Sequence, residues 1–109
     1  MEFEIILLEQ AVEFINSLDV KFRAKTYRTI ELLGDFGFFL KEPHSKKLSG
    51  YDNLYELRVK LGSNICRLFY FHHHNRIFVI TSGYIKKEQK TNIREIESAL
   101  HIMKSYLGN

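Results

Sequence analysis

The 109-residue chain contains no tryptophan, one cysteine, one proline and no long apolar run. With Cys66 as the only cysteine, an internal disulfide and a zinc site built from several cysteines are excluded. No apolar stretch approaches the roughly 20 residues that cross a bilayer. The first four residues, Met1-Glu2-Phe3-Glu4, carry negative charge where a secretory signal would carry positive charge. These absences favour a cytoplasmic protein with no membrane partner, built as a single domain over residues 1–109.

Charged side chains are distributed unevenly along the sequence. Residues 41–94 hold 11 basic and 4 acidic side chains, whereas residues 1–40 hold 4 basic and 7 acidic. The formal net charge of +3 therefore hides a strongly basic central part. Because clustered cations build a potential that attracts phosphates, we expect this part to bind a polyanion.

The spacing of apolar residues in the first third predicts a strand followed by two helices. Residues 2–7 alternate apolar and acidic side chains, which is typical of a short strand with one buried face. Helical spacing continues to about Leu18, and Asp19 can cap a second helix from Val20 to about Leu33, with Gly34 as its end. This part of the fold is therefore predicted to be a strand beside a helical hairpin.

Three further strands are predicted for Leu54–Leu61, Ile65–His72 and Arg76–Ile85, because short turn sequences separate them. The segment before them, 37–53, contains the only proline and a turn-rich sequence, so we expect a loop there. The chain as a whole is predicted to be an α+β fold with a mostly antiparallel sheet.

The last segment predicts a helix, capped by Asn92 and carrying an apolar stripe. The stripe consists of residues three and four apart: Ile93, Ile96, Leu100, Met103 and Leu107. We expect it to pack on the domain's own sheet, although such a stripe could instead bind a partner helix.

A two-residue turn at Gly62-Ser63 would determine which side chains face each other on the first two of these strands. In that register Arg58 lies directly opposite Arg67, and Glu56 and Lys60 share their face of the sheet. Like charges in facing positions cost stability, so we expect an anion between the two arginines. The alternative is that Arg58 and Glu56 are solvated and that Arg67 makes a structural hydrogen bond or ion pair.

Further cations extend this basic surface. Lys86 and Lys87 end the last strand, and Lys90 and Arg94 continue toward the final helix. Tyr84, beside them, could stack on a base or donate its hydroxyl. The remaining candidates for RNA contact are three lysines of the preceding segments: Lys46, Lys47 and Lys60.

His72-His73-His74 raises the question of a metal site. Consecutive strand residues point to opposite faces, and no Asp, Glu or Cys partner stands at a suitable spacing. We therefore expect no metal and no cofactor, and histidines that are solvated or contact RNA. Cys66 lies within an apolar strand, which is typical of a small buried residue rather than a nucleophile.

Segments of the sequence resemble one family along nearly the whole chain. They are L...G....EP..KKL at 33–48, LYELR at 54–58, CRLFY at 66–70, KKEQKT at 86–91 and EI..A at 95–99. In order and spacing they are similar to toxins of the RelE superfamily from type II toxin–antitoxin systems, in the HigB, phage Gp49-like branch.

The resemblance implies a RelE-like fold, with two N-terminal helices beside a twisted, mostly antiparallel sheet and a C-terminal helix. It also implies a metal-independent endoribonuclease, an mRNA interferase that cleaves messenger RNA on the ribosome and inhibits translation. A helix-turn-helix, HigA-like antitoxin would neutralise it, and operator DNA would be reached only through that antitoxin.

The basic residues that such toxins use match Arg58, Arg67 and Lys86 or Lys87. By this resemblance the two arginines would clamp phosphate, and the lysines would hold the scissile phosphate or the neighbouring backbone. Glu56 replaces a lysine of RelE-like relatives, as the HigB branch tolerates. It could act as the base, with Tyr84 or a histidine as the acid, but the residues do not assign this pair.

Two other functions stay open at the level of sequence. A ParE-like toxin would inhibit DNA gyrase, and a catalytically decayed homologue would bind RNA without cleaving it. The arginine pair together with Lys86 and Lys87 favours cleavage, whereas Glu56 keeps the decayed-site alternative open. We expect the substitution Arg67→Ala to abolish toxicity and to leave the fold intact.

Overall fold

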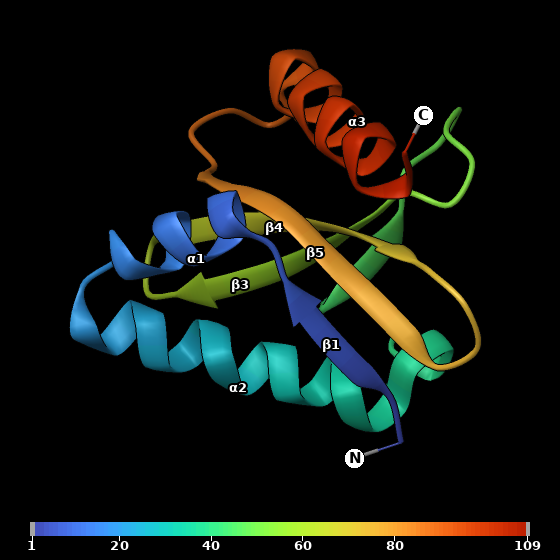
Figure 1. Ribbon diagram of the computed structural model, residues 1–109. Coiled ribbons are helices and arrows are strands. Elements are labelled where there is room, and N and C mark those ends of the chain that lie inside the picture. The colour runs from blue at the N-terminus through green and yellow to red at the C-terminus, as the bar shows by residue number, and fades with distance from the viewer. Residues whose placement is uncertain (1, 109) are drawn as a thin grey trace.

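The computed structural model describes residues 2–108, which form three α-helices, a 3₁₀ turn and one five-stranded sheet (Figure 1). In chain order these are β1 (Glu4–Leu7), α1 (Glu9–Asn16), α2 (Val20–Phe36), η1 (Gly37–Phe39), β2 (Ser45–Lys47), β3 (Tyr55–Leu61), β4 (Asn64–His72), β5 (Ile77–Ile85) and α3 (Ile93–Leu107). The strand order is β1-β5-β4-β3-β2, with β1 parallel to β5 and the other neighbours antiparallel. The predicted α+β class is confirmed.

The helices cover the two faces of the sheet unequally. Helices α1 and α2 lie against one face, and α3 lies on the opposite side (Figure 1). The larger core cluster joins α1 and α2 to the sheet through residues such as Ile15, Leu33 and Leu57. A smaller cluster packs Phe69 of β4 against Ile96 of α3. Helix α3 is therefore held against the sheet by fewer core residues than the α1–α2 hairpin.

Helix α2 begins where the sequence predicts it and ends later. The Asp19 carboxylate accepts a hydrogen bond of 2.9 Å from the Phe22 amide, as expected for an N-cap. The predicted end at Gly34 is wrong, because Gly34 is buried within the helix and its carbonyl accepts a 2.8 Å hydrogen bond from the Phe3 amide. The helix ends at Gly37, whose φ of 53° suits glycine.

The three predicted strands are confirmed to within one residue at each end. Leu61 pairs with Asn64 and Arg58 with Arg67, so the two-residue turn produces the predicted register. Strand β2 lies in the segment that we expected to be a loop. Its three residues are too short and polar to show an alternating pattern, and it forms by pairing with β3.

The predicted C-terminal helix is confirmed, with the Asn92 side chain accepting a 2.9 Å hydrogen bond from the Arg94 amide. Only the middle of its apolar stripe packs on the sheet, through Ile96 and Leu100. The Ile93 side chain at its start is 60% exposed. Within residues 2–108, no helix has the length and apolarity needed to cross a bilayer.

Candidate functional site

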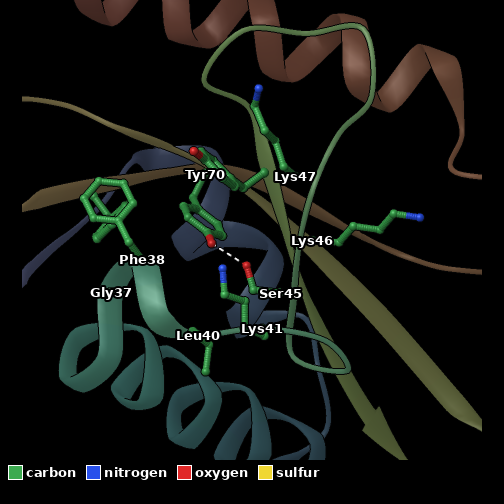
Figure 2. A pocket seen from close by; sticks show the side chains of 10 residues that line it. Gly37, Phe38, Leu40, Lys41, Ser45, Lys46, Lys47 and Tyr70 are labelled. Atoms are coloured by element: carbon green, nitrogen blue, oxygen red, sulfur yellow. Dashed lines mark hydrogen bonds between the residues drawn. The ribbon is translucent and has the colours of Figure 1, made fainter.

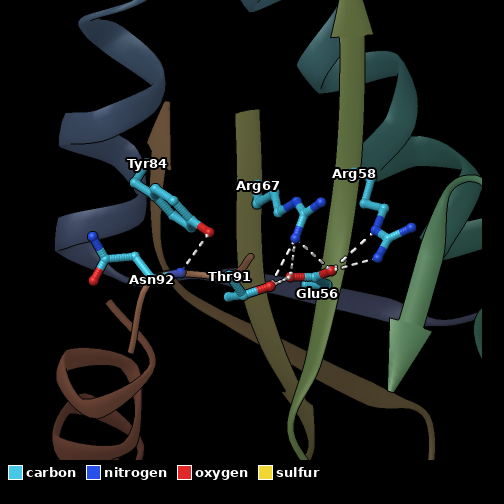
Figure 3. A network of polar contacts seen from close by, with 6 residues as sticks. All are labelled: Glu56, Arg58, Arg67, Tyr84, Thr91 and Asn92. Carbon is cyan, nitrogen blue, oxygen red and sulfur yellow. Dashed lines mark hydrogen bonds and ion pairs between the residues drawn. The ribbon is translucent and has the colours of Figure 1, made fainter. Parts of the chain in front are cut away.

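A buried ionic network lies on the sheet face that α3 partly covers (Figure 3). Strand β3 contributes Glu56 and Arg58, and β4 contributes Arg67, the cross-strand partner of Arg58. Thr91 reaches the network from the segment between β5 and α3. The Glu56 side chain is 1% exposed, that of Arg67 9% and that of Arg58 26%.

The Glu56 carboxylate connects all the other members of this network. Arg58 approaches its Oε1 through Nε at 3.0 Å and a terminal nitrogen at 2.9 Å. The Nη1 atom of Arg67 lies 3.0 Å from Oε1 and 3.2 Å from Oε2. Thr91 accepts a 2.7 Å hydrogen bond from the same Nη1 and donates one of 3.1 Å to Oε2. Both carboxylate oxygens are thus engaged.

The anion expected between the two arginines is therefore the carboxylate of Glu56 itself. The alternative of a solvated Glu56 is wrong, and the alternative of a structural ion pair for Arg67 is confirmed. Two guanidinium groups share one carboxylate, so the network keeps a surplus positive charge. Arg58, the most exposed member, carries that charge to the surface.

One candidate on β5, Tyr84, continues the network across the sheet. Tyr84 is the cross-strand partner of Arg67, so Arg58, Arg67 and Tyr84 form a row across three strands. The Tyr84 ring stacks on Phe69 with centroids 5.8 Å apart. Its hydroxyl accepts a 3.4 Å hydrogen bond from the backbone N–H of Asn92. This row brings guanidinium and phenol groups to one face.

Lys86 lies two residues beyond Tyr84 and is half-buried. Partial desolvation lowers the pKa of its ammonium group, and the positive charges of Arg67 and Arg58 lower it further, against the opposing effect of Glu56. The electrostatic influence of both arginines places Lys86 in the same local field. Its neighbour Lys87 is exposed.

Lys87 and Lys90 contribute instead to a separate hollow of about 360 Å³, which Tyr84 also lines. Two acidic residues, Glu88 and Glu95, border the same hollow and reduce its positive potential. Arg94 is exposed at the start of α3.

The β2 lysines point to different sides of the sheet. Lys46 pairs with Glu56 and Lys47 with Tyr55, so only Lys46 shares the face of the ionic network. Lys41, Lys46 and Lys47 all line a pocket of about 360 Å³, and Figure 2 shows the side chains of Lys46 and Lys47 pointing in different directions. A buried hydrogen bond joins Ser45 and Tyr70 in this pocket, and burial raises the pKa of the Tyr70 hydroxyl to about 12. Lys47 therefore does not belong to the network.

The predicted histidine and cysteine candidates lie outside the network. His72 packs edge-on against Phe38, with ring centroids 4.7 Å apart, near the β4–β5 turn. Among residues 2–108, no cluster of His, Cys, Asp and Glu is arranged to hold a metal ion. Cys66 is fully buried, and desolvation raises the pKa of its thiol to about 11, so the predicted burial is confirmed.

Thr91 is the member of the network that sequence reasoning missed as a site residue. It ends the KKEQKT segment, directly before the Asn92 cap. A threonine at such a position is an ordinary loop residue by sequence. Its role follows only from the path of the chain back over β3 and β4.

Comparisons with known proteins agree on family and fold. The family described as "Phage derived protein Gp49-like" matches residues 13–104. Among solved structures, a double-arginine mutant of the E. coli toxin RelE in the free state is similar with a TM-score of 0.63 at 18% identity, over 93% of this chain and 97% of that chain. The intact E. coli RelBE toxin–antitoxin complex gives 0.61 at 17% identity, over 79% and 99%.

The YoeB dimer from Staphylococcus aureus gives a TM-score of 0.57 at 22% identity, over 81% of this chain and 99% of that chain. No protein of curated function matches the sequence. At these identities the similar structures establish the RelE-like toxin fold.

Proposed function

Because the chain belongs to the phage-derived Gp49-like family, we propose that it is the toxin of a type II toxin–antitoxin system. In this proposal it is a single-domain, metal-independent endoribonuclease that cleaves mRNA on the ribosome, in the cytoplasm. A HigA-like helix-turn-helix antitoxin neutralises it. The similarity to a RelE chain solved in a toxin–antitoxin complex supports the antitoxin partner.

The buried ionic network is the observation that carries this proposal. Attack of a 2′-hydroxyl on the adjacent phosphate builds negative charge on the phosphorane, which fixed cations stabilise best. Glu56 and Thr91 hold the Arg67 guanidinium in one orientation, and Arg58 and Lys86 flank it at the surface. Charges fixed in this way need no reorganisation when the phosphorane forms.

The geometry suggests different roles for the members of the site. Arg58 and Arg67 clamp the phosphate, and Lys86 with Lys87 holds the scissile group or the neighbouring backbone. We assign to Tyr84, the cross-strand partner of Arg67, the donation of a proton to the leaving 5′-oxygen. Glu56 is buried with both oxygens engaged, so we assign it to positioning the guanidinium groups rather than to abstracting a proton.

Burial of Arg67 changes the choice of test variant. Arg67→Ala would leave the buried Glu56 with fewer partners, so a loss of toxicity could reflect loss of the fold. Arg58→Ala and Lys86→Ala change more exposed side chains and keep the Glu56–Arg67 pair. Lys21→Ala, on the exposed side of α2, removes one positive charge far from this network in the sequence and serves as the control.

The test is induction of each variant in bacteria without antitoxin, following growth and mapping new 5′ ends on mRNA. We expect the wild type and Lys21→Ala to arrest growth and to produce new ends, and Arg58→Ala and Lys86→Ala to lose both effects. Arrest with DNA damage and no new ends would instead support gyrase inhibition. Absence of arrest in the wild type would support the decayed-site alternative.

A further inference from the structure

A second basic hollow, of about 290 Å³, lies at the edge of β3, and we call it the edge pocket. It brings together side chains from α2, the loop before β2, and strands β3 and β4. Those that carry the inference are Lys25, Pro43, His44, Lys60 and the two arginines, Arg58 and Arg67. The hollow therefore shares its arginines with the ionic network and adds residues that the proposed function does not use.

The hollow exists because β2 is shorter than β3. Strand β2 pairs with β3 only from Tyr55 to Leu57, so on the side away from β4 the rest of β3 has no strand beside it. The loop before β2 approaches this free edge, where the His44 carbonyl accepts a 2.7 Å hydrogen bond from the Arg58 amide. Helix α2 runs alongside β3 and closes the other side (Figure 1).

The lining of the edge pocket is positive and contains no carboxylate. Lys25, Lys60 and both arginines line it, and no Asp or Glu does so. Glu56 neutralises part of the charge of the two arginines, and Lys25 and Lys60 add further positive charge to the hollow. This lining therefore favours a negatively charged ligand.

Arg67 gives a second, independent indication of a ligand. Only its Nη1 atom serves Glu56 and Thr91. Its Nε atom is buried and has no hydrogen-bond partner among the residues that the structure describes. A buried donor without an acceptor costs free energy, and Arg67 is one of the residues that line the edge pocket, so a movement of its side chain toward a ligand there would give this donor an acceptor.

We propose that the edge pocket binds a backbone phosphate of single-stranded RNA, one nucleotide away from the phosphate that Arg58 and Lys86 hold. This inference rests on the proposed function and extends it to Lys25, Lys60 and His44. The two lysines neutralise the phosphate, and the His44 ring offers a surface on which the adjoining base can stack. Val59 and Ile65 supply apolar contact for the nucleoside. The volume is close to the lower end, about 300 Å³, of small-ligand pockets.

The test compares two RNA probes that carry one or two phosphates. The probes are a dinucleoside monophosphate and the corresponding trinucleotide with two phosphates. Both are fluorescently labelled, and both are 2′-O-methylated so that they cannot be cleaved. The wild type should bind the trinucleotide about two- to fivefold more tightly, the range of one exposed ion pair. Lys25→Ala and Lys60→Ala should each lose this gain and keep the wild-type affinity for the one-phosphate probe.

Lys21→Ala lies one turn earlier on α2, does not line the edge pocket, and should behave as the wild type. For the trinucleotide, the slope of log affinity against log salt should fall by about 0.7 in Lys25→Ala, as for one lost phosphate contact. Equal affinity of the wild type for both probes would overturn phosphate binding in the edge pocket and leave the proposed function standing. So would a preference for the trinucleotide that stays unchanged in both pocket variants. Failure of the wild type to bind either probe would overturn the proposed function as well.

Discussion

Glu56 is the residue on which the two arginines depend. Facing guanidinium groups on neighbouring strands repel each other, and a buried carboxylate between them reverses that repulsion. The desolvation of Glu56 is tolerable only because Arg58, Arg67 and Thr91 all contact it. Glu56 therefore fixes the orientation of the Arg67 guanidinium and at the same time compensates its buried charge.

Removing the carboxylate should destabilise the fold strongly. Glu56→Ala leaves Arg67 buried without its counter-charge, and we expect a loss of about 3–5 kcal/mol in the free energy of unfolding. Urea denaturation followed by circular dichroism measures it. Glu88→Ala, an exposed carboxylate, should cost under about 0.5 kcal/mol. A loss for Glu56→Ala as small as this control would mean that the network contributes little to stability.

Lys86 should make RNA binding sensitive to alkaline pH. Its lowered pKa means that the neutral amine forms at a lower pH than the ordinary 10.5, so the positive charge is present below that pKa and lost above it. We expect affinity for an uncleavable RNA to fall as pH rises through the lowered pKa of Lys86, below the ordinary lysine value of about 10.5. Lys86→Arg, which stays charged, should remove most of the fall.

Lys87→Arg is the matched control for this pH dependence, because Lys87 is the exposed neighbour. Lys87→Arg should lose RNA affinity with rising pH as the wild type does. If Lys86→Arg loses as much RNA affinity with rising pH as the wild type, another group is responsible for the pH dependence.

The sequence predicts the arginine pair but not what lies between them. The register follows from a two-residue turn and the alternation of strand residues, which are local properties. The burial of Glu56 depends in part on Thr91, which reaches this face from 35 residues further along the chain. Such a long-range closure has no signature in the periodicity of β3.

At the scale of elements, the end of α2 depends on close packing at Gly37. Its φ is +53°, and an added Cβ would lie 2.2 Å from the Phe3 ring. Phe3 in turn lies directly before β1, and its amide donates to the Gly34 carbonyl. A single glycine thus lets the end of α2 approach the start of β1.

Gly37→Ala should therefore cost more stability than a substitution at an open glycine. We expect a loss in the free energy of unfolding of about 1–3 kcal/mol for the backbone strain, because φ 53° with ψ −123° is a conformation that essentially only glycine adopts, and about 1–3 kcal/mol for the clash, measured by urea unfolding. Gly62→Ala also has a positive φ, of 62°, but nothing lies within 4 Å of the added Cβ, so it should show only the first cost. Equal losses in the two variants would mean that the Phe3 contact relaxes freely.

The predictability of each element depends on how local its signal is. The three long strands and α3 carry their own periodicity, so the sequence predicts them closely. Gly34 is a misleading stop, because tertiary contacts to β1 outweigh the modest helix penalty of one glycine. Strand β2 has no pattern of its own and exists only through its partner β3.

At the scale of the whole molecule, charge is concentrated where the site lies. The basic excess of residues 41–94 contrasts with the acidic excess of residues 1–40, which form β1, α1, α2 and η1. This polarity orients an approaching polyanion toward β3, β4 and the end of β5. The sequence alone predicts this feature, because it depends on composition rather than on contacts.

RNA binding should therefore weaken steeply with salt. A site that neutralises two phosphates, one at the ionic network and one at the edge pocket, should give a slope of about −1.4 in log affinity against log salt, from about −0.7 per contact on a single strand. Fluorescence anisotropy with an uncleavable RNA measures it. Lys86→Ala should make the slope less negative by about 0.7, and Lys21→Ala should leave it unchanged. A slope near zero in the wild type would contradict a phosphate-binding face.

The parallel pairing of β1 with β5 has a consequence for synthesis on the ribosome. The chain emerges from its first residue, yet Glu4–Leu7 pairs with Ile77–Ile80, more than 70 residues later. The β3–β4 hairpin can form as soon as it leaves the exit tunnel, whereas β1, and the packing of α1 on β5, must wait. A nascent chain therefore gains Lys86, Thr91 and its closed sheet only near the end of translation, so the proposed ribonuclease site would be complete only when the protein is almost finished.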